Sequence, residues 1–352
     1  MLHGISFLPD CTPETKSAAA YFADAFRLAT IADESGLSSV KMTEHYMNAY
    51  GGYCPSPLSF LSNVAARTNT IRLMTGCVLP AFHHPVQLAA ETAMLDVMSG
   101  GRLDVGVARA WLPYEFQTFG VSLDDSRELF TDSLDAIVRL WTEPSVTMKT
   151  RFFELNEVSS TPKPLQSPHP PIWGAAVMSP ESVMNLGAAG RNLLLPSSLG
   201  GPAGSQRFIE LYRKAFAALT PKQQGRVAIS VPLVIGDSMA DAIAVGDRYL
   251  ARYLDVWASA GDAWNAVASR DYPSYSGVGH ALRATTPQVL RELGAAVIGD
   301  AESVADQIRS LVEIVDVDEI LWQIDFGAMP GELAERTLRR LIDEVLPALA
   351  TN

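Results

Sequence analysis

Cysteine is scarce in this sequence: Cys11, Cys54 and Cys77 are the only three among 352 residues. They form no close-spaced pair, and an odd number fits poorly with a disulfide framework, so we expect free thiols in a reducing cytoplasm. No Cys/His group has the spacing of zinc ligands, and no metal site is predicted. No run of about 18 apolar residues exists that would cross a bilayer, and the N-terminus lacks the basic region of a signal peptide.

Basic residues are in the minority. Lys and Arg number 27 against 39 Asp and Glu, which gives a formal charge of −12 and disfavours nucleic acid and anionic membranes as partners. Two common motifs are also missing. No Gly-x-Gly-x-x-Gly follows the first expected strand, and Ser179 has no Gly-x-Ser-x-Gly setting. A dinucleotide-binding sheet and a serine-hydrolase nucleophile are therefore not supported.

Apolar residues make up 48% of the chain and charged residues 19%, so the chain can bury a large core. Short apolar runs alternate with longer stretches of helical periodicity, which is typical of a parallel sheet covered by helices. Eight such units predict a closed (β/α)8 TIM barrel, with an open doubly wound sheet as the alternative. The expected strands are 5–8, 39–43, 71–79, 103–108, 171–176, 192–195, 227–235 and 319–324.

The whole chain, residues 1–352, is expected to form one barrel domain with two insertions. The first, about 143–170, contains a small hairpin and a proline-rich connection. The second, about 259–285, includes a stretch rich in Gly, Ser and Tyr that lacks periodicity (261–283). Because long loops in compact domains often close over binding sites, we call residues 259–285 the candidate lid.

In a barrel of this kind the chemistry lies where the strands end. Arg109 follows the fourth strand, and a guanidinium matches phosphate oxygens in a bidentate manner. Ser179 and Pro180 open a helix whose free amides favour an anion. These residues predict a phosphate site. The alternative is that Arg109 pairs with Asp104 or Glu115 while Ser179 only caps its helix.

Two histidines stand near strand ends. His45 follows the second strand, where a lone histidine is more often structural than catalytic, but Glu44 and the Tyr-rich segment 46–53 beside it favour a place in a pocket. His84 precedes Pro85 at a helix start and is interpreted as structural.

Several strings together resemble the bacterial luciferase-like flavin monooxygenases. They are Thr43-Glu44-His45-Tyr46, Tyr50-Gly51-Gly52-Tyr53-Cys54-Pro55, Val78-Leu79-Pro80 with His84-Pro85, Leu95-Asp96-Val97-Met98-Ser99-Gly100-Gly101-Arg102, and Phe119-Gly120-Val121 with Ser126-Arg127. The similarity runs from about residue 44 to 141 and resumes at 168–182 and 299–307. The Leu-Asp-x-x-Ser-x-Gly-Arg string is specific in this order and spacing.

The resemblance implies a luciferase-like barrel that binds FMN at the carboxyl ends of its strands. The phosphate ligands would be Arg109 and Arg127 with Ser179 and the backbone near it. A non-prolyl cis peptide beneath the flavin ring would fall on Thr75-Gly76, where glycine lowers the steric cost. The cofactor-binding residues expected in this way are Thr75, Gly76, Arg109, Arg127, Val177, Met178 and Ser179.

The resemblance also implies a reaction. Reduced FMN, supplied by a separate flavin reductase, would react with molecular oxygen to give a peroxyflavin that oxygenates a small organic molecule. His45 would act as general acid or base, and Glu44 would contact the flavin edge or orient His45. Tyr46 and Trp111 would line the substrate side, and the candidate lid would close over it. Relatives often pair through helices of the first half, so a homodimer is expected.

This sequence departs from the family at three positions. Tyr46 replaces a second histidine found in many relatives, and Ala108 stands where bacterial luciferase has a reactive cysteine, so light emission is not indicated. Ala110 replaces a glycine. Two other functions stay open on the same scaffold: a deazaflavin-dependent dehydrogenase, which transfers hydride, and a non-catalytic flavin-binding protein. The sequence does not name the substrate.

Overall fold

The computed structural model describes residues 1–177, 179–196, 200–220 and 223–350. Its strands are β1 (Leu2–Phe7), β2 (Ser39–Met42), β3 (Arg72–Thr75), β4 (Leu103–Val107), β5 (Val146–Lys149), β6 (Glu154–Val158), β7 (Ile172–Ala175), β8 (Asn192–Pro196), β9 (Val227–Ile235), β10 (Val297–Gly299) and β11 (Glu319–Gln323).

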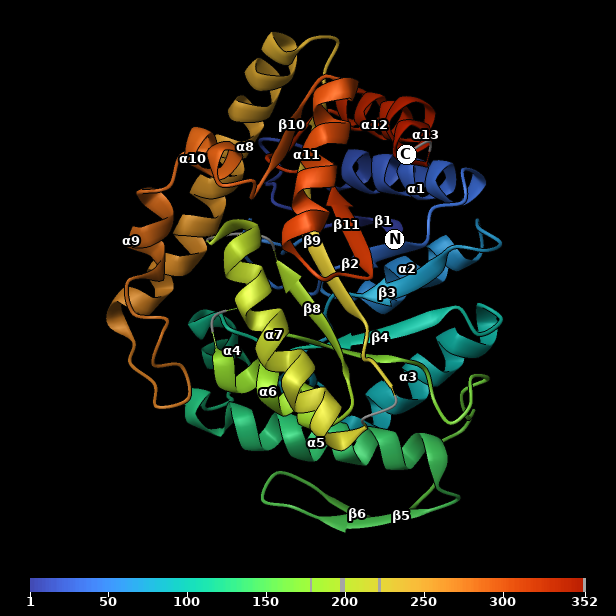
Figure 1. Cartoon of the computed structure of the whole chain (residues 1–352). Coiled ribbons are helices and arrows are strands. Elements are labelled where there is room, and N and C mark those ends of the chain that lie inside the picture. The colour runs from blue at the N-terminus through green and yellow to red at the C-terminus, as the bar shows by residue number, and fades with distance from the viewer. Residues whose placement is uncertain (178, 197–199, 221–222, 351–352) are drawn as a thin grey trace.

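Helices alternate with these strands along the chain (Figure 1). They are α1 (Ala18–Glu34), α2 (Pro57–Ala65), η1 (Pro80–Phe82), α3 (Pro85–Met98), α4 (Pro113–Phe119), η2 (Leu123–Asp125), α5 (Ser126–Thr142), α6 (Pro180–Ala188), α7 (Gly201–Leu219), α8 (Met239–Gly261), η3 (Asp262–Ala266), α9 (Val278–Arg283), α10 (Pro287–Glu292), α11 (Ala301–Ile314), α12 (Gly331–Arg340), η4 (Leu341–Val345) and α13 (Leu346–Ala350).

Eight parallel strands close into a ring in the order β9, β11, β1, β2, β3, β4, β7, β8, and β8 pairs with β9 to complete it. The (β/α)8 barrel predicted from the sequence is therefore confirmed, and each predicted strand corresponds to one strand of the ring. The strands are buried on both faces, as expected for a sheet that is covered by helices and filled by its own side chains. The apolar interior comprises Met74, Cys77, Trp173, Leu194, Ala228 and Leu321.

Side-chain caps define where many helices begin. Ser17, Ser56 and Ser179 each accept a hydrogen bond from a backbone amide in the first turn of α1, α2 and α6. His84 has the same function at α3, where its Nδ1 accepts from the amide of Val86. The structural interpretation of His84 is thus confirmed. The three cysteines are free thiols, as predicted, and the structure shows that all three are buried.

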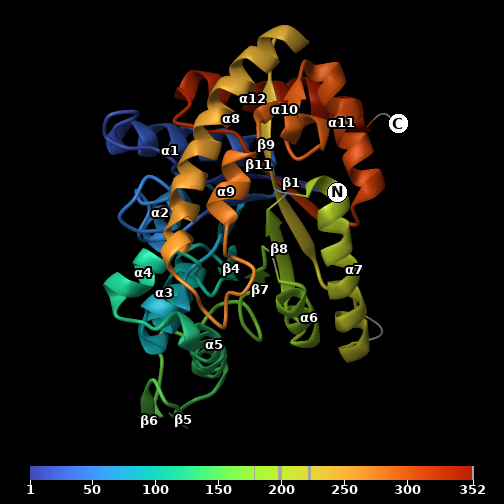
Figure 2. The ribbon, with the colours of Figure 1, turned by 90° about the vertical axis from the view of Figure 1, so that its left-hand side faces the viewer.

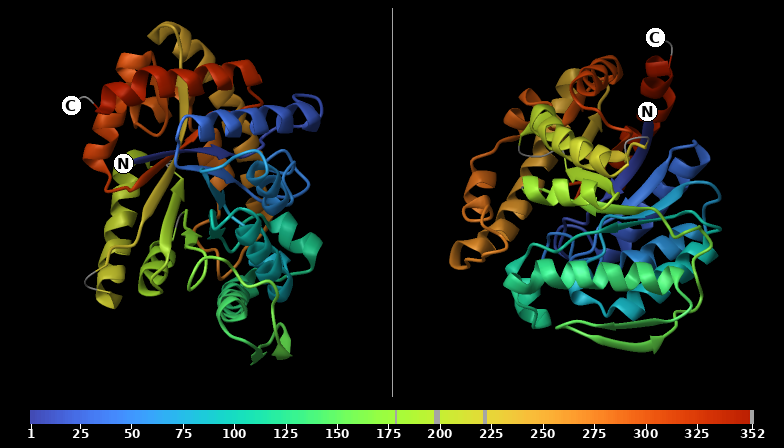
Figure 3. Two further views of the ribbon diagram at one scale, coloured as in Figure 1. Left: turned by 90° about the vertical axis from the view of Figure 1, so that its right-hand side faces the viewer. Right: turned by 60° about the horizontal axis from the view of Figure 1, so that its bottom comes forward.

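The first insertion contains the antiparallel pair β5 and β6, the small hairpin that the sequence predicts. It lies outside the barrel along α5 (Figure 3). The second insertion is more helical than its composition suggested. It consists of the end of α8, the short helix η3, an irregular segment (267–277) and α9, and it descends towards α4 and α5 (Figure 2). Strand β10, which pairs with the last three residues of β9 (Leu233–Ile235), was not predicted.

No helix within the described residues is long and apolar enough to cross a membrane. Those residues also contain no group of three or more His, Cys, Asp or Glu side chains arranged to hold a metal ion.

Candidate active site

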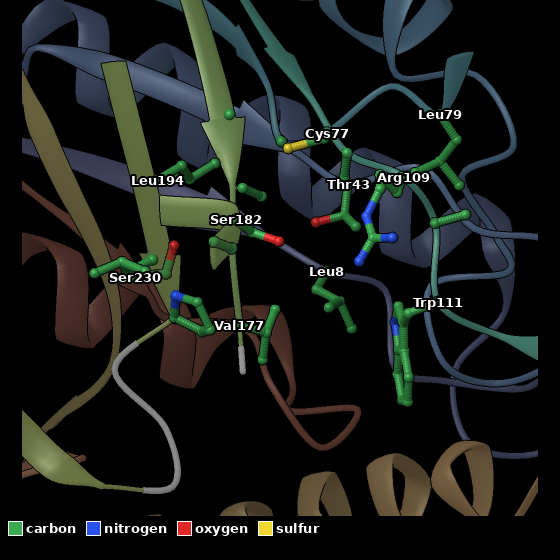
Figure 4. A pocket seen from close by; sticks show the side chains of 18 of the residues that line it. Leu8, Thr43, Cys77, Leu79, Arg109, Trp111, Val177, Ser182, Leu194 and Ser230 are labelled. Carbon is green, nitrogen blue, oxygen red and sulfur yellow. The ribbon is translucent and has the colours of Figure 1, made fainter. Parts of the chain in front are cut away.

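A cavity of about 290 Å³ opens at the carboxyl ends of the barrel strands. In Figure 4, Arg109 and Trp111 lie on one side of it, and Leu194, Val177 and Ser230 lie on the other. Most of the predicted site residues contribute to its lining. These are Glu44, His45, Gly76, Arg109, Trp111, Arg127, Val177 and Ser179. Met178 lies outside the described residues. Thr75 and Tyr46 are not among the lining residues.

Arg109 emerges two residues after β4 and has no carboxylate partner in the described chain. Its Nη1 donates a long hydrogen bond of 3.4 Å to the backbone oxygen of Asp271, and its guanidinium lies 4.7 Å from the centre of the Tyr272 ring. The alternative ion pairs do not form, because Asp104 binds Arg72 and Glu115 binds His45. The Arg109 guanidinium therefore remains available to an anion in the cavity.

Arg127 lies in the first turn of α5, and its side chain is one-third exposed. Its ion pair is loose, with 3.4 Å between Nη2 and an oxygen of Glu181, a carboxylate that is 63% exposed. An exposed pair of this kind contributes little. The hydroxyl of Ser179 accepts a hydrogen bond of 3.2 Å from the amide of Ser182, so Ser179 does cap α6. Both this serine and Ser182 nevertheless line the cavity beside the two arginines.

The candidate lid is held over this end of the cavity by contacts to the barrel loops. The Ser269 hydroxyl donates to Asp124 at 2.6 Å, and the Tyr272 hydroxyl donates to the backbone oxygen of Ala110 at 2.9 Å. Tyr272 and Tyr275 line the cavity. The second insertion thus covers Arg109 and Arg127, which we call the arginine cluster. This is the position that a closing segment needs.

His45 is paired with a carboxylate that the sequence analysis did not place there. Its Nδ1 lies 3.1 Å from Oε1 of Glu115, a residue of α4 that is fully buried. The same oxygen accepts from the amide of Tyr46 at 2.9 Å. Glu115 therefore orients the imidazole, and Nε2 is the ring nitrogen left for the cavity. The prediction that Glu44 orients His45 is corrected, because the fold brings Glu115 to Nδ1 instead.

Glu44 is fully buried and is held by three donors. Its Oε1 accepts from the Tyr46 hydroxyl at 2.6 Å and contacts Nε2 of His83 at 2.7 Å, and its Oε2 accepts from the amide of Leu79 at 3.0 Å. Tyr46 is therefore turned to Glu44 and to Phe119, away from the substrate side where the sequence placed it. Burial and the neighbouring Glu44 carboxylate raise the pKa of Tyr46, which keeps its hydroxyl a donor.

The contact between His83 and Glu44 gives the first testable prediction. Burial alone would lower the pKa of His83, but the hydrogen bond and charge of Glu44 outweigh it and the pKa is raised. The ion pair therefore adds stability below the pKa of an unfolded histidine and is lost as pH rises through the folded value. In thermal unfolding, we expect His83→Gln to lose about 1 kcal/mol at pH 6 and less at pH 9. The exposed His280→Gln is the control, and an equal loss at both pH values would contradict the pair.

The non-prolyl cis peptide lies one bond later than the sequence suggested, at Gly76–Cys77. Thr75 is still part of the β3 ladder opposite Met42, and the Gly76 amide donates to the Met42 oxygen at 2.7 Å. The Thr75 hydroxyl bonds both backbone groups of Gly106, so it fastens β3 to β4. Gly76 lines the cavity, whereas Thr75 supports the strand behind it.

Aromatic side chains form much of the remaining wall. Trp111 packs edge-on against Tyr50 with 5.6 Å between ring centres, and Tyr50 lies nearly parallel to Trp257 at 6.5 Å. The sequence analysis missed Trp257 of this wall, because it lies on α8, outside the motifs. It also missed Lys41 of β2, which lines the floor of the cavity. Its position in an otherwise apolar strand was the available signal.

The fold and the site together define a TIM-barrel enzyme whose cavity combines cationic, imidazole and aromatic groups at the strand ends. The model of the family "Luciferase-like monooxygenase" matches residues 2–317. The chain therefore belongs to the luciferase-like monooxygenase family, as the sequence motifs predict.

Two proteins similar over most of the chain carry monooxygenase names. The chain is 27% identical to the oxygenase component of flavin-dependent trigonelline monooxygenase from Acinetobacter baylyi, over 93% of this chain and 89% of the relative. The crystal structure of monooxygenase RslO1 from Streptomyces bottropensis has 34% identity and a TM-score of 0.86, with 99% of both chains covered.

More distant structures show the fold alone. The oxygenating constituent of 3,6-diketocamphane monooxygenase from Pseudomonas putida, in complex with FMN, has 17% identity and a TM-score of 0.79, covering 99% of this chain and 98% of that one. An F420-dependent secondary alcohol dehydrogenase, in complex with an F420–acetone adduct, has 17% identity and a TM-score of 0.76 with the same coverage.

Proposed function

We propose that this enzyme is the oxygenase component of a two-component system, which receives reduced FMN from a separate flavin reductase and oxygenates a small organic substrate. The observation that carries the proposal is the pair Arg109 and Arg127, which line one end of the cavity and have no buried carboxylate partner among the described residues. Two guanidinium groups beside hydroxyl groups suit a phosphate monoester. The relative named as an oxygenase component supports the dependence on a reductase.

The residues present fit a flavin mononucleotide. The cationic end, with Ser179 and Ser182, would hold the phosphate, and the planar ring system would lie beside Gly76. Glu44 retains one acceptor position on Oε2 after binding Leu79, and we assign it to a donor at the flavin edge. When bound, reduced flavin supplies the electrons that activate molecular oxygen.

His45 is assigned as the catalytic acid or base. Its Nδ1 is fixed by Glu115, so Nε2 can hold a proton for the oxygen-transfer site or accept one from it. Both side chains of the pair are buried, which holds the imidazole in one orientation. Trp111 and the candidate lid exclude water from the same space. Glu115 acts through His45 and is a positioning residue.

A homodimer is part of this proposal. Met94, Val97 and Met98 are exposed on α3, a helix of the first half of the chain, and such side chains are suited to an interface between subunits. Light scattering of the purified protein measures this directly.

Oxygen uptake separates the proposed function from the deazaflavin alternative. Protein loaded anaerobically with reduced FMN is mixed with oxygen, and a second sample is loaded with oxidised deazaflavin and given alcohols as hydride donors. We expect binding of FMN and oxygen consumption in the first sample, with no reduction of the deazaflavin in the second. Deazaflavin reduction without an oxygen reaction would overturn the proposal, and flavin binding without either reaction would indicate a non-catalytic flavin protein.

A further inference from the structure

Three polar side chains form a row on the floor of the cavity, on the side of β1, β2 and β11. Ser6 of β1 stands opposite Lys41 of β2 and opposite Gln323 of β11 in the register of the parallel ladders. Residues opposed in this way point to the same face of a sheet, and all three line the cavity. Their exposed fractions are 1%, 7% and 5%, so the row is shielded from solvent in the described structure.

Lys41 is a buried cation without an anionic partner in the described residues. The Cys77 thiol lies near Lys41, but burial raises the pKa of that thiol to about 12, so it offers no negative charge at neutral pH. Burial lowers the pKa of Lys41 to about 8. The ammonium is thus mostly charged at pH 7. Its methylene stem packs against Gly76, where an added Cβ would meet the Lys41 side chain. Holding an unpaired ammonium in such a place is costly, which indicates that a ligand completes it.

The other members of the row also have donors to offer. The side-chain nitrogen of Gln323 is buried and forms no hydrogen bond of good geometry within the described residues, although the Tyr253 hydroxyl lies close enough to interact with the Gln323 side chain. The Ser6 hydroxyl forms no hydrogen bond with the described residues. In the register of the strands, Ser6 lies between Lys41 and Gln323. An ammonium, an amide NH2 and a hydroxyl in one row select a ligand atom that accepts hydrogen bonds and carries negative charge.

This row is distinct from the arginine cluster. Lys41 lies on β2, whereas Arg109 follows β4 and Ser179 follows β7, and β3 separates β2 from β4 in the ring. The lining of the same cavity includes the nearly parallel rings of Tyr50 and Trp257. Flat aromatic walls favour a planar ring system.

We propose that Lys41, assisted by Ser6 and Gln323, binds an acidic oxygen of a planar aromatic substrate, a carboxylate or a phenolate. The proposal rests on the proposed function, because it assigns the arginine end of the cavity to the flavin phosphate. Lys41 then selects the substrate and fixes the orientation in which its ring faces the flavin.

The test compares two probes of one shape, 1-naphthoate and its neutral amide 1-naphthamide, by isothermal titration calorimetry. Lys41→Met removes the charge and keeps an unbranched side chain, and the exposed Lys149→Met is the matched control. One set of titrations is done on protein saturated with FMN, and a second on flavin-free protein in excess inorganic phosphate. The phosphate set remains decisive if FMN does not bind, so failure of the proposed function is seen separately.

We expect wild type and Lys149→Met to prefer naphthoate over naphthamide by about tenfold or more, and Lys41→Met to lose this preference. Because the substitution removes a buried charge, the ligand-free Lys41→Met protein should unfold at the same or a higher temperature. A preference that survives in Lys41→Met, or that is lost in Arg109→Ala, would place the acid in the arginine cluster and overturn the proposal. If Lys41→Met binds FMN more weakly but binds naphthoate and naphthamide as wild type does, Lys41 belongs to the flavin site. That result would also overturn the proposal.

Discussion

Replacement of Arg109 by alanine is expected to weaken FMN binding by about 30-fold or more, which corresponds to about 2 kcal/mol. The guanidinium has no carboxylate partner in the described chain, so its hydrogen bonds are available to the phosphate. Equilibrium titration of flavin absorbance measures the change. Riboflavin, which lacks the phosphate, is expected to bind wild type and variant alike.

The control for this variant is Arg139→Ala. Arg139 belongs to α5, as Arg127 does, but its guanidinium binds Glu143 one turn further along the helix. Its replacement is expected to leave FMN affinity unchanged. Arg109 also touches the candidate lid through Asp271 and Tyr272, and a loosened lid would weaken riboflavin and FMN equally. Equal losses for the two flavins would therefore contradict the phosphate assignment.

Replacement of His45 by alanine is expected to lower product formation by about 100-fold or more, because positioned acid–base groups contribute rate factors of this order. Oxygen consumption by the reduced flavin is expected to continue, with hydrogen peroxide released in place of product. The measurement is product formed per oxygen consumed. Undiminished coupling in His45→Ala would remove the residue from catalysis.

Glu115→Gln separates chemistry from positioning. The amide keeps the size of the side chain and an oxygen that can accept from Nδ1 of His45, but it removes the negative charge beside the imidazole. We expect the product formed per oxygen consumed to lie between the values for wild type and His45→Ala, with the affinity for FMN unchanged. A Glu115→Gln protein as active as wild type would show that the pair has no part in turnover.

The barrel was predictable because its strands are short, mainly apolar runs at regular spacing, and each run marks a buried strand. The helix predicted to open at Ser179 and Pro180 is α6, since these two residues are strong start signals. Strand β10 was not predicted because its three residues, Val297–Gly299, are too few to show a periodic pattern. The candidate lid was aperiodic in sequence, yet η3 and α9 form there through tertiary packing against α8.

Only those site residues that directly follow a barrel strand could be predicted from the sequence. Arg109 and His45 follow β4 and β2 and do line the cavity. The partner of His45 was missed because Glu115 is 70 residues away in sequence, and only the fold brings the two together. Tyr46 was assigned to the cavity by adjacency, but side chains that follow a strand point in different directions, and Glu44 holds its hydroxyl elsewhere.

The most direct measurement of the central claim is a crystal structure of the protein grown with FMN. We expect the phosphate to lie within hydrogen-bonding distance of Arg109 and Arg127, with the ring system beside Gly76. A cavity free of flavin at saturating FMN, or a flavin whose phosphate lies away from both arginines, would contradict the account.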